Sequence, residues 1–344
     1  MTPSVPPPPT DHPLSRSNLV AALGLLLALA SCSHSTPPLE QARMSSQLAE
    51  PVIRQCVGRF CLGVPASMAR TSDTFALQYV SMKEVLWKEP DDKARELAWT
   101  ARLARIEALK ARRELPTDVQ GEIRAQRELA SGFRGVMFHE ADNPALISWG
   151  GLLRRGPVDV WMQIDGDLDR EDQWAARLVA LSQAYRPMEP KEPWPVPGKD
   201  WFYLHHGLVA LPMKFKEEAQ SVFEGHPLNL KLAITTKTES RVNKKNLMQR
   251  LSDSLALASG EMQGSLVTQK YKSRKVAGLP GEELILRYTE GNDSELYCLW
   301  TYAGEENSGS HPKMTIEMES SLEQDDAKVA LWNQLLDSVR PAGL

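Results

Sequence analysis

The sequence predicts an α+β fold with two tandem related domains, each an antiparallel sheet with two helices packed on one face. Two observations support this prediction: the same order of strands and helices occurs twice, and a proline-rich break separates the two occurrences. A third is the length of 344 residues, since one hydrophobic core seldom serves so long a chain.

Residues 1–31 are predicted to be a signal peptide. Arg16 precedes an apolar run over residues 19–30, which is too short to cross a bilayer, because a spanning helix needs about 20 apolar residues. The run leads into the sequence LASC, whose cysteine is Cys32, and this tetrapeptide resembles the lipobox of bacterial lipoproteins. The resemblance implies cleavage before Cys32 and lipidation of its thiol. The alternative is an ordinary signal peptide with a chance cysteine.

Residues 32–50 are expected to form a flexible tether, because they are polar and have no apolar period. Ser33 follows the cysteine, whereas an aspartate there is the usual mark of inner-membrane retention in lipoproteins of this kind. We therefore expect the folded part of the chain to lie in the periplasm, held to the outer membrane by lipid.

The N-terminal domain is expected over residues 51–187. It opens with two strands, the first ending at Pro65, and a helix around Trp99 follows them. Three further strands come next, and a helix from Arg170 ends where Pro187 stops it. The second strand and the three later ones are predicted over residues 75–87, 135–140, 145–150 and 158–165.

Residues 188–199 are predicted to form a stiff, extended linker. Proline recurs there at Pro190, Pro193, Pro195 and Pro197, and it lacks the backbone donor that a helix or a central strand needs. Two lobes on either side of such a linker leave a groove between them, and we expect a partner to bind in that inter-lobe groove.

The C-terminal domain, residues 200–344, repeats the order of the first. A strand ends at Pro212, a helix lies around Leu251, and a last helix from Asp325 ends before Pro341. The other strands are predicted over residues 228–236, 283–290, 295–302 and 313–319. Each half closes on an Arg-Pro pair after its final helix, which favours duplication over a chance likeness of two α+β domains.

Charge and cysteine content exclude several classes of function. A net charge of −4 argues against a nucleic-acid-binding protein, whose domain is normally strongly basic. After Cys32 three cysteines remain, and the periplasm is oxidising, so one pair could form a disulfide. Cys56 and Cys61 lie five apart on what is interpreted as one strand, which places them on opposite faces. A disulfide, if present, is therefore expected to join Cys298 to Cys56 or Cys61.

No motif for catalysis, metal or phosphate binding stands out. The pentapeptide Gly-x-Ser-x-Gly of hydrolases is missing, and the serines and histidine of residues 307–311 are interpreted as turn chemistry in a polar loop. His139 lacks a second histidine at zinc-binding spacing, and adjacent His205 and His206 would point to opposite faces of a strand. The aspartates of residues 165–169 precede a helix, and negative charges there interact favourably with the helix dipole. We therefore predict a binding protein that has no enzyme activity, metal, cofactor or small-molecule substrate.

Three stretches resemble one family. They are CVGRFCLGVPASM at residues 56–68, VAGLPGEELILRY at residues 276–288 and LYCLW at residues 296–300. They resemble the lipoprotein immunity proteins that neutralise lipase effectors of type VI secretion, and the resemblance extends over about residues 51–340. It implies a two-domain periplasmic protein that binds a phospholipase toxin and keeps it from lipid. No catalytic residue follows from it. The alternative is an envelope structural or assembly lipoprotein without a toxin partner.

Overall fold

The computed structural model describes residues 50–343, apart from residues 89–90, 116, 189–198, 214–215, 259–264 and 291–292. The predicted signal peptide, the lipidation site at Cys32 and almost all of the predicted tether and linker lie outside the described residues. Among the residues described, no helix is long and apolar enough to span a membrane.

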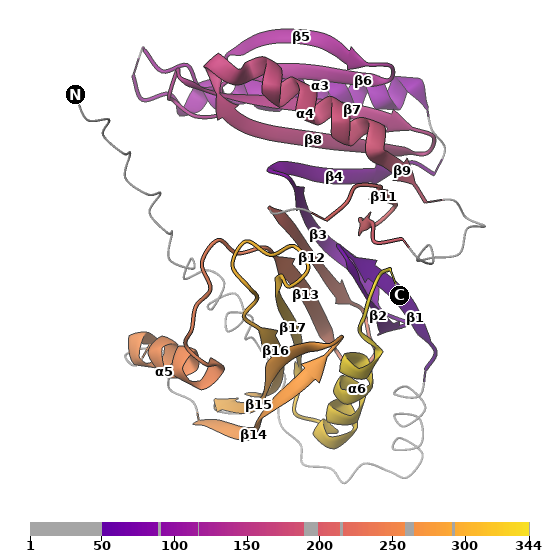
Figure 1. The fold of residues 1–344 in the computed structure, drawn as a ribbon, viewed down its shortest axis with the longest axis vertical. Helices are drawn as coiled ribbons and strands as arrows, with labels where there is room; N and C mark the ends of the chain where they lie inside the picture. Colours follow the sequence, from indigo (N-terminus) through magenta and orange to yellow (C-terminus); the bar gives the residue numbers. More distant parts are fainter. Residues whose placement is uncertain are drawn as a thin grey trace.

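A 12-stranded sheet forms the centre of the fold (Figure 1), and its neighbouring strands pair antiparallel. The first half of the chain supplies β3 (Ala69–Leu77), β4 (Val80–Leu86), β5 (Ile123–Ala130), β6 (Phe133–Phe138), β7 (Leu146–Arg155) and β8 (Val158–Asp167). The second half supplies β12 (Glu217–Glu224), β13 (Lys231–Lys237), β14 (Ser265–Val276), β15 (Leu279–Glu290), β16 (Asp293–Tyr302) and β17 (Lys313–Ser321). Their order is β5-β6-β7-β8-β4-β3-β12-β13-β17-β16-β15-β14. With its helices, this mostly antiparallel structure confirms the predicted α+β class.

Two small sheets and four α-helices complete the described structure. One small sheet has the order β1-β2-β18 and the other the order β10-β11-β9. Their strands are β1 (Val52–Val57), β2 (Phe60–Pro65), β9 (Tyr185–Pro187), β10 (Phe202–Tyr203), β11 (Gly207–Val209) and β18 (Arg340–Pro341). The α-helices are α3 (Asp92–Ala108), α4 (Glu171–Ala184), α5 (Leu247–Ala258) and α6 (Asp325–Ser338), and the short 3₁₀ helices are η1 (Leu109–Arg112) and η2 (Leu168–Arg170).

The order of elements repeats, and each repeat is richer in strands than the sequence predicts. Four strands, a helix, four strands, a helix and a short strand run from β1 to β9, and the same series runs from β10 to β18. The sheet order is symmetric about the contact between β3 and β12. The predicted strand over residues 75–87 is wrong, because the chain reverses at Gln78 and Tyr79 to form the β3–β4 hairpin. That turn has neither Gly, Asn nor Asp, the residues that usually mark a two-residue hairpin.

The two halves of the chain are joined directly by paired strands. Strand β12 of the second half pairs with β3 of the first over eight residues, from Glu217↔Leu77 to Glu224↔Ala69. The small sheets also combine both halves, because β18 pairs with β2 and β9 pairs with β11. Gly58 and Tyr203 exchange two backbone hydrogen bonds across the same junction, of 2.9 and 2.8 Å. The halves are thus joined by backbone pairing, and the expected tandem arrangement of two domains is not confirmed.

The helices of each half cover opposite faces of the sheet, so the prediction of two helices on one face is wrong. Helix α3 buries Trp99 and Ile106 against Val136 and Trp161. Helix α4 contacts β7 and β8 from the other side and buries Leu178 in the main core. The reason lies in the strands: β8 is buried on both faces over its first five residues, as in a strand covered on two sides. In the second half, α5 and α6 belong likewise to separate apolar clusters.

The cysteine pairing differs from the prediction as well. Cys56 and Cys61 form a disulfide with a Cα–Cα distance of 4.0 Å, and Cys298 is a buried free thiol in β16. The two paired cysteines do not share a strand. The chain turns at Gly58, which has a positive φ of 57°, so β1 and β2 place the two cysteines directly opposite each other. A five-residue separation across a tight hairpin therefore brings them together, and the expected bridge to Cys298 is wrong.

Candidate functional site at the junction of the two halves

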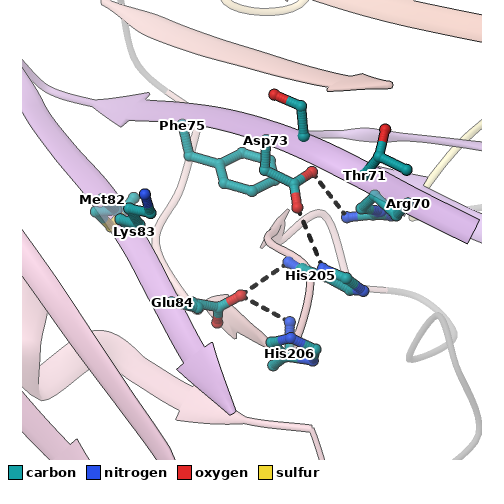
Figure 2. Close-up of a pocket in the computed structure, with 10 residues that line it drawn as sticks. Arg70, Thr71, Asp73, Phe75, Met82, Lys83, Glu84, His205 and His206 are labelled. Carbon is teal, nitrogen blue, oxygen red and sulfur yellow. Dashed lines mark hydrogen bonds and ion pairs between the residues drawn. The ribbon is translucent and has the colours of Figure 1, made fainter. Parts of the chain in front are cut away.

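A pocket of about 260 Å³ opens where the central sheet divides. Strands β3 and β4 pair only from Leu77↔Val80 to Phe75↔Met82. Beyond that point β3 continues beside β12 and β4 continues beside β8, so the two strands diverge (Figure 1). The pocket lies between them, and the turn from β10 to β11 closes one side of it (Figure 2). It is lined by Arg70, Thr71, Ser72, Asp73, Phe75, Met82, Lys83, Glu84, His205 and His206.

Asp73 links β3 to two parts of the second half. Its carboxylate accepts a hydrogen bond of 2.5 Å from the hydroxyl of Ser221 on β12 and lies 3.2 Å from Nδ1 of His205. The Arg70 guanidinium is 3.6 Å away. Burial opposes ionisation of the carboxyl, but the hydrogen bonds from His205 and Ser221, together with the Arg70 charge, outweigh it and hold the pKa of Asp73 below its usual range. Asp73 is therefore a carboxylate at neutral pH.

Glu84 fixes the turn that closes the pocket. Its carboxylate accepts hydrogen bonds from the backbone N–H groups of His205 (2.9 Å) and His206 (2.7 Å) and from the hydroxyl of Tyr185 (2.6 Å). Burial raises the pKa of Glu84 above its usual range, although these three hydrogen bonds favour the ionised form. One side chain of β4 thus binds β9 of its own half and the β10–β11 turn of the second half, so it couples the two halves through the two backbone donors of His205 and His206.

The two histidines stack on each other in this turn. Their ring centroids are 3.9 Å apart with an interplanar angle of 16°. Burial, with the neighbouring charges of His205 and Arg70, lowers the pKa of His206 to about 4, so its ring is neutral at pH 7. The prediction that His205 and His206 point to opposite faces of a strand is wrong, because both lie in a turn between β10 and β11.

The polar groups of this pocket do not form a nucleophile and base. In a hydrolytic triad the histidine lies between the acid and the nucleophile. Here the Asp73 carboxylate lies between Ser221 and His205, and the Ser221 hydroxyl, which is fully buried, donates to the carboxylate. The arrangement can therefore order the junction and offer polar contacts to a partner, but it does not activate Ser221.

Other residues considered from the sequence lie apart from this pocket. His139 is buried, and its Nδ1 is 2.7 Å from the carbonyl of Leu146. His226 is buried near Glu50. Asp165 accepts a hydrogen bond of 2.6 Å from Ser148. In the part of the chain that the structure describes, no group of three or more His, Cys, Asp or Glu side chains could hold a metal ion.

A second cavity of about 450 Å³ lies beside the polar loop of residues 307–311. Ser310 and His311 line it together with Arg59, Phe60 and Pro341. The Ser310 hydroxyl is 3.1 Å from Nδ1 of its neighbour His311, and the backbone N–H of His311 donates to Ser308. These are contacts within one turn, and the histidine also lies 3.3 Å from Glu305 on the same loop.

Asp73 and Glu84, the two carboxylates that organise the junction, were not predicted from the sequence. Asp73 follows the alternation of Phe75 and Leu77 on β3, and Glu84 follows that of Val80 and Met82 on β4. An acidic residue at an inward-facing position of an alternating strand is rarely buried without partners. This alternation could have predicted the two buried carboxylates. It was overlooked because the turn at residues 78–79, which has no usual turn residue, made β3 and β4 look like one strand.

Comparison with known proteins finds a family match in the second half. Residues 196–342 match the family model for the C-terminal domain of Tle cognate immunity protein 4. The match confirms the family resemblance drawn from the sequence, and it begins within the predicted linker and ends close to the last residue. Among curated proteins none matches this sequence.

Three solved structures share the fold over 85% of this chain. A chain of the Tle4–Tli4 complex has a TM-score of 0.67 at 19% identity, with 85% of this chain and 97% of that chain covered. The apo form of TplEi, a type VI secretion immunity protein from Pseudomonas aeruginosa, has a TM-score of 0.66 at 19% identity and the same coverage. TplEi complexed with an "L" peptide has a TM-score of 0.63 at 18% identity, covering 85% and 99%.

Proposed function

We propose that this chain is an immunity protein that binds a phospholipase effector of type VI secretion in the periplasm and blocks its hydrolysis of membrane lipid. The observation that supports it most directly is the family match over residues 196–342, which spans the second half of the repeat. The shared fold with a chain of the Tle4–Tli4 complex agrees with a role in binding a partner protein. The partner is then a secreted lipase.

The geometry of the junction favours binding over catalysis. Ser221 is buried and donates to Asp73, so the pocket at the junction lacks an activated nucleophile. The halves are joined by backbone pairing of β3 with β12, which makes the large surface of both halves a preformed one. Preformed surfaces lose less conformational entropy on association, as tight inhibition requires. We therefore propose that the protein inhibits by occupying the effector and has no enzyme activity of its own.

Lipid attachment at Cys32 belongs to the same proposal. An anchor beside the membrane under attack raises the local concentration of inhibitor where the effector acts. The sequence LASC followed by Ser33 supports acylation and the outer membrane. The Cys32→Ala variant should incorporate no radioactive fatty acid, and label retained by this variant would remove the assignment.

The decisive experiment mixes the purified mature protein with the lipase effector encoded beside its gene. Lipid hydrolysis is measured against inhibitor concentration. Because a tight complex holds about one immunity protein per enzyme, we expect hydrolysis to be abolished near a roughly 1:1 molar ratio of the two proteins. The immunity protein alone should release no fatty acid. Undiminished hydrolysis at a molar excess would contradict the proposal and favour an envelope structural or assembly lipoprotein.

A further inference from the structure

We infer that Tyr79, Trp174, Arg177 and Lys216 form a binding patch, called the Tyr79 patch below, that anchors an acidic surface of the effector. The inference rests on the proposed function and adds the residues that make the contact and the charge of the partner surface. The patch lies at the β3–β4 turn, next to the pairing of β3 with β12, so residues of both halves contribute to it.

Tyr79 is the most exposed aromatic side chain among the described residues, at 60%. The guanidinium of Arg177, on α4, lies 5.9 Å from its ring centroid, and Nζ of Lys216 lies 5.6 Å from it. Arg177 also lies 5.5 Å from the ring of Trp174. Tyr, Trp and Arg are the residue types that dominate binding energy at protein interfaces.

The backbone beneath Tyr79 is strained and held in place. Gln78, Tyr79 and Lys216 have positive φ angles of 52°, 72° and 71°, a conformation that residues other than glycine seldom adopt. The N–H of Gln78 donates to the carbonyl of Lys216 at 2.7 Å, and Arg177 donates to the carbonyl of Gln78 at 3.2 Å. Strain kept at an exposed turn where glycine would relieve it points to a use for the side chain.

The charge of the patch selects the partner. Arg177 and Lys216 place two cations around one aromatic ring. Over the residues with described positions, no carboxylate forms a salt bridge with Arg177, so its charge is available to a partner. A carboxylate of the partner could bind the guanidinium while an apolar group packs on Tyr79, which is the combination that gives both affinity and electrostatic steering. The partner surface is therefore acidic with an apolar centre.

The test measures the affinity of the full mature chain for the lipase encoded beside its gene. Tyr79→Ala should weaken binding by about 30-fold or more, the loss typical of an interface anchor. Tyr79→Gly is the sharper variant, because glycine accepts the positive φ without strain and so should keep or raise the melting temperature while binding is lost equally. Arg177→Gln should slow association most at low salt, since steering weakens as ionic strength rises.

Tyr271→Ala is the matched control. Tyr271 is 41% exposed on β14, the edge strand at the far end of the sheet from β5, and its replacement should leave the affinity unchanged within about twofold, as surface changes outside an interface do. Binding by wild type that survives Tyr79→Ala and Tyr79→Gly overturns the patch alone. Absence of wild-type binding overturns the patch and the proposed function together. Equal losses of affinity in the Tyr79 and Tyr271 variants also overturn the Tyr79 patch. If wild type binds phosphatidylglycerol vesicles and Tyr79→Ala abolishes that binding, the patch contacts lipid, and the inference is overturned as well.

Discussion

Arg59 and Glu217 form a buried, two-pronged ion pair that joins the two halves of the chain. Nε and Nη2 of Arg59, in the β1–β2 turn, each donate to one carboxylate oxygen of Glu217, the first residue of β12, at 2.7 Å. The two residues are 5% and 7% exposed. Arg59 also donates to the carbonyl of Leu211, so most of its donors have a partner. The pair therefore fixes where β12 begins beside β3.

Removing one member of this pair should destabilise the protein strongly. Glu217→Ala leaves the buried Arg59 charge with only the half-exposed Asp200 carboxylate, 3.7 Å away, as a counter-ion. We expect the free energy of unfolding to fall by about 3–5 kcal/mol. The double variant Arg59→Met with Glu217→Leu should recover much of that loss, because it removes both charges. Urea unfolding followed by circular dichroism gives the free energy of unfolding of wild type, the single variant and the double variant.

An exposed ion pair provides the control for that series. Lys245 and Asp253 lie 2.7 Å apart with side chains 58% and 55% exposed. Asp253→Ala should cost less than about 1 kcal/mol, as exposed pairs do. A cost for Glu217→Ala as small as this one would show that Arg59 finds other partners, and the assigned role of the pair would be wrong.

Thiol chemistry should separate the three cysteines that follow the predicted lipidation site. Burial and the nearby Glu283 carboxylate raise the pKa of the Cys298 thiol to about 12, so it should not react with iodoacetamide in the native protein at pH 8. In a Cys32→Ser variant of the mature chain, denaturation without reductant should expose one reactive thiol, that of Cys298. Mass spectrometry of the alkylated protein counts the thiols that have reacted. Three reactive thiols, or a peptide joining Cys298 to another cysteine, would contradict the structure.

Reduction of the Cys56–Cys61 disulfide should have a modest effect. The bridge closes a short loop, and the chain-entropy model gives about 2 kcal/mol for a loop of this size. Cys56→Ala with Cys61→Ala should lower the urea midpoint without changing the slope of the transition. A variant that does not fold at all would show that the hairpin depends on the disulfide and not on its pairing with β18.

The pH dependence of stability should include a contribution from His206. Its pKa in the folded protein is about 4, below the ordinary value of 6.5, so between these values the unfolded chain binds more protons. Its contribution is therefore fully present above pH 6.5 and is lost as the pH falls toward 4. We expect His206→Gln to remove about 1–2 kcal/mol of this loss, less than the full shift implies, because the ring is partly exposed to solvent.

The neighbours of His206 determine how this experiment must be done. His205, Arg70 and Asp73 contribute charges around the ring, and the nearby Glu84 has a raised pKa. A raised carboxyl pKa stabilises the fold as the pH falls, which is opposite in sign to the histidine effect. The difference between the wild-type and His206→Gln unfolding curves, measured at each pH from 4 to 7, isolates the histidine. Parallel curves would rule out its depressed pKa.

The class of fold could be predicted from the sequence, but the pairing of strands between the two halves could not. The strands with clear alternation or continuous apolar runs, such as β8 and β16, were predictable because burial dictates their residues. Strand β12 was missed because its sequence EEAQSVFE is half acidic or amide, although Glu217, Ala219, Ser221 and Phe223 all face inward. Glu217 is buried only because Arg59, distant in sequence, lies beside it. Such pairing cannot be read from a local pattern.

Separating the halves should therefore expose edges that the intact chain covers. A fragment of residues 200–344 loses β3 as the neighbour of β12 and β9 as the neighbour of β11, and a fragment of residues 51–187 loses the reverse contacts along with β18 beside β2. Unpaired strand edges promote aggregation, and the Arg59–Glu217 pair is divided as well. We expect each fragment alone to be poorly soluble and the two co-expressed fragments to form a soluble 1:1 complex, measured by size-exclusion chromatography with light scattering.

Limited proteolysis of the intact chain near residues 188–199 should accordingly leave the two pieces associated until denaturant is added. Two independently soluble, folded fragments that do not associate would instead support separate domains on a linker and would contradict the role assigned to the β3–β12 contact.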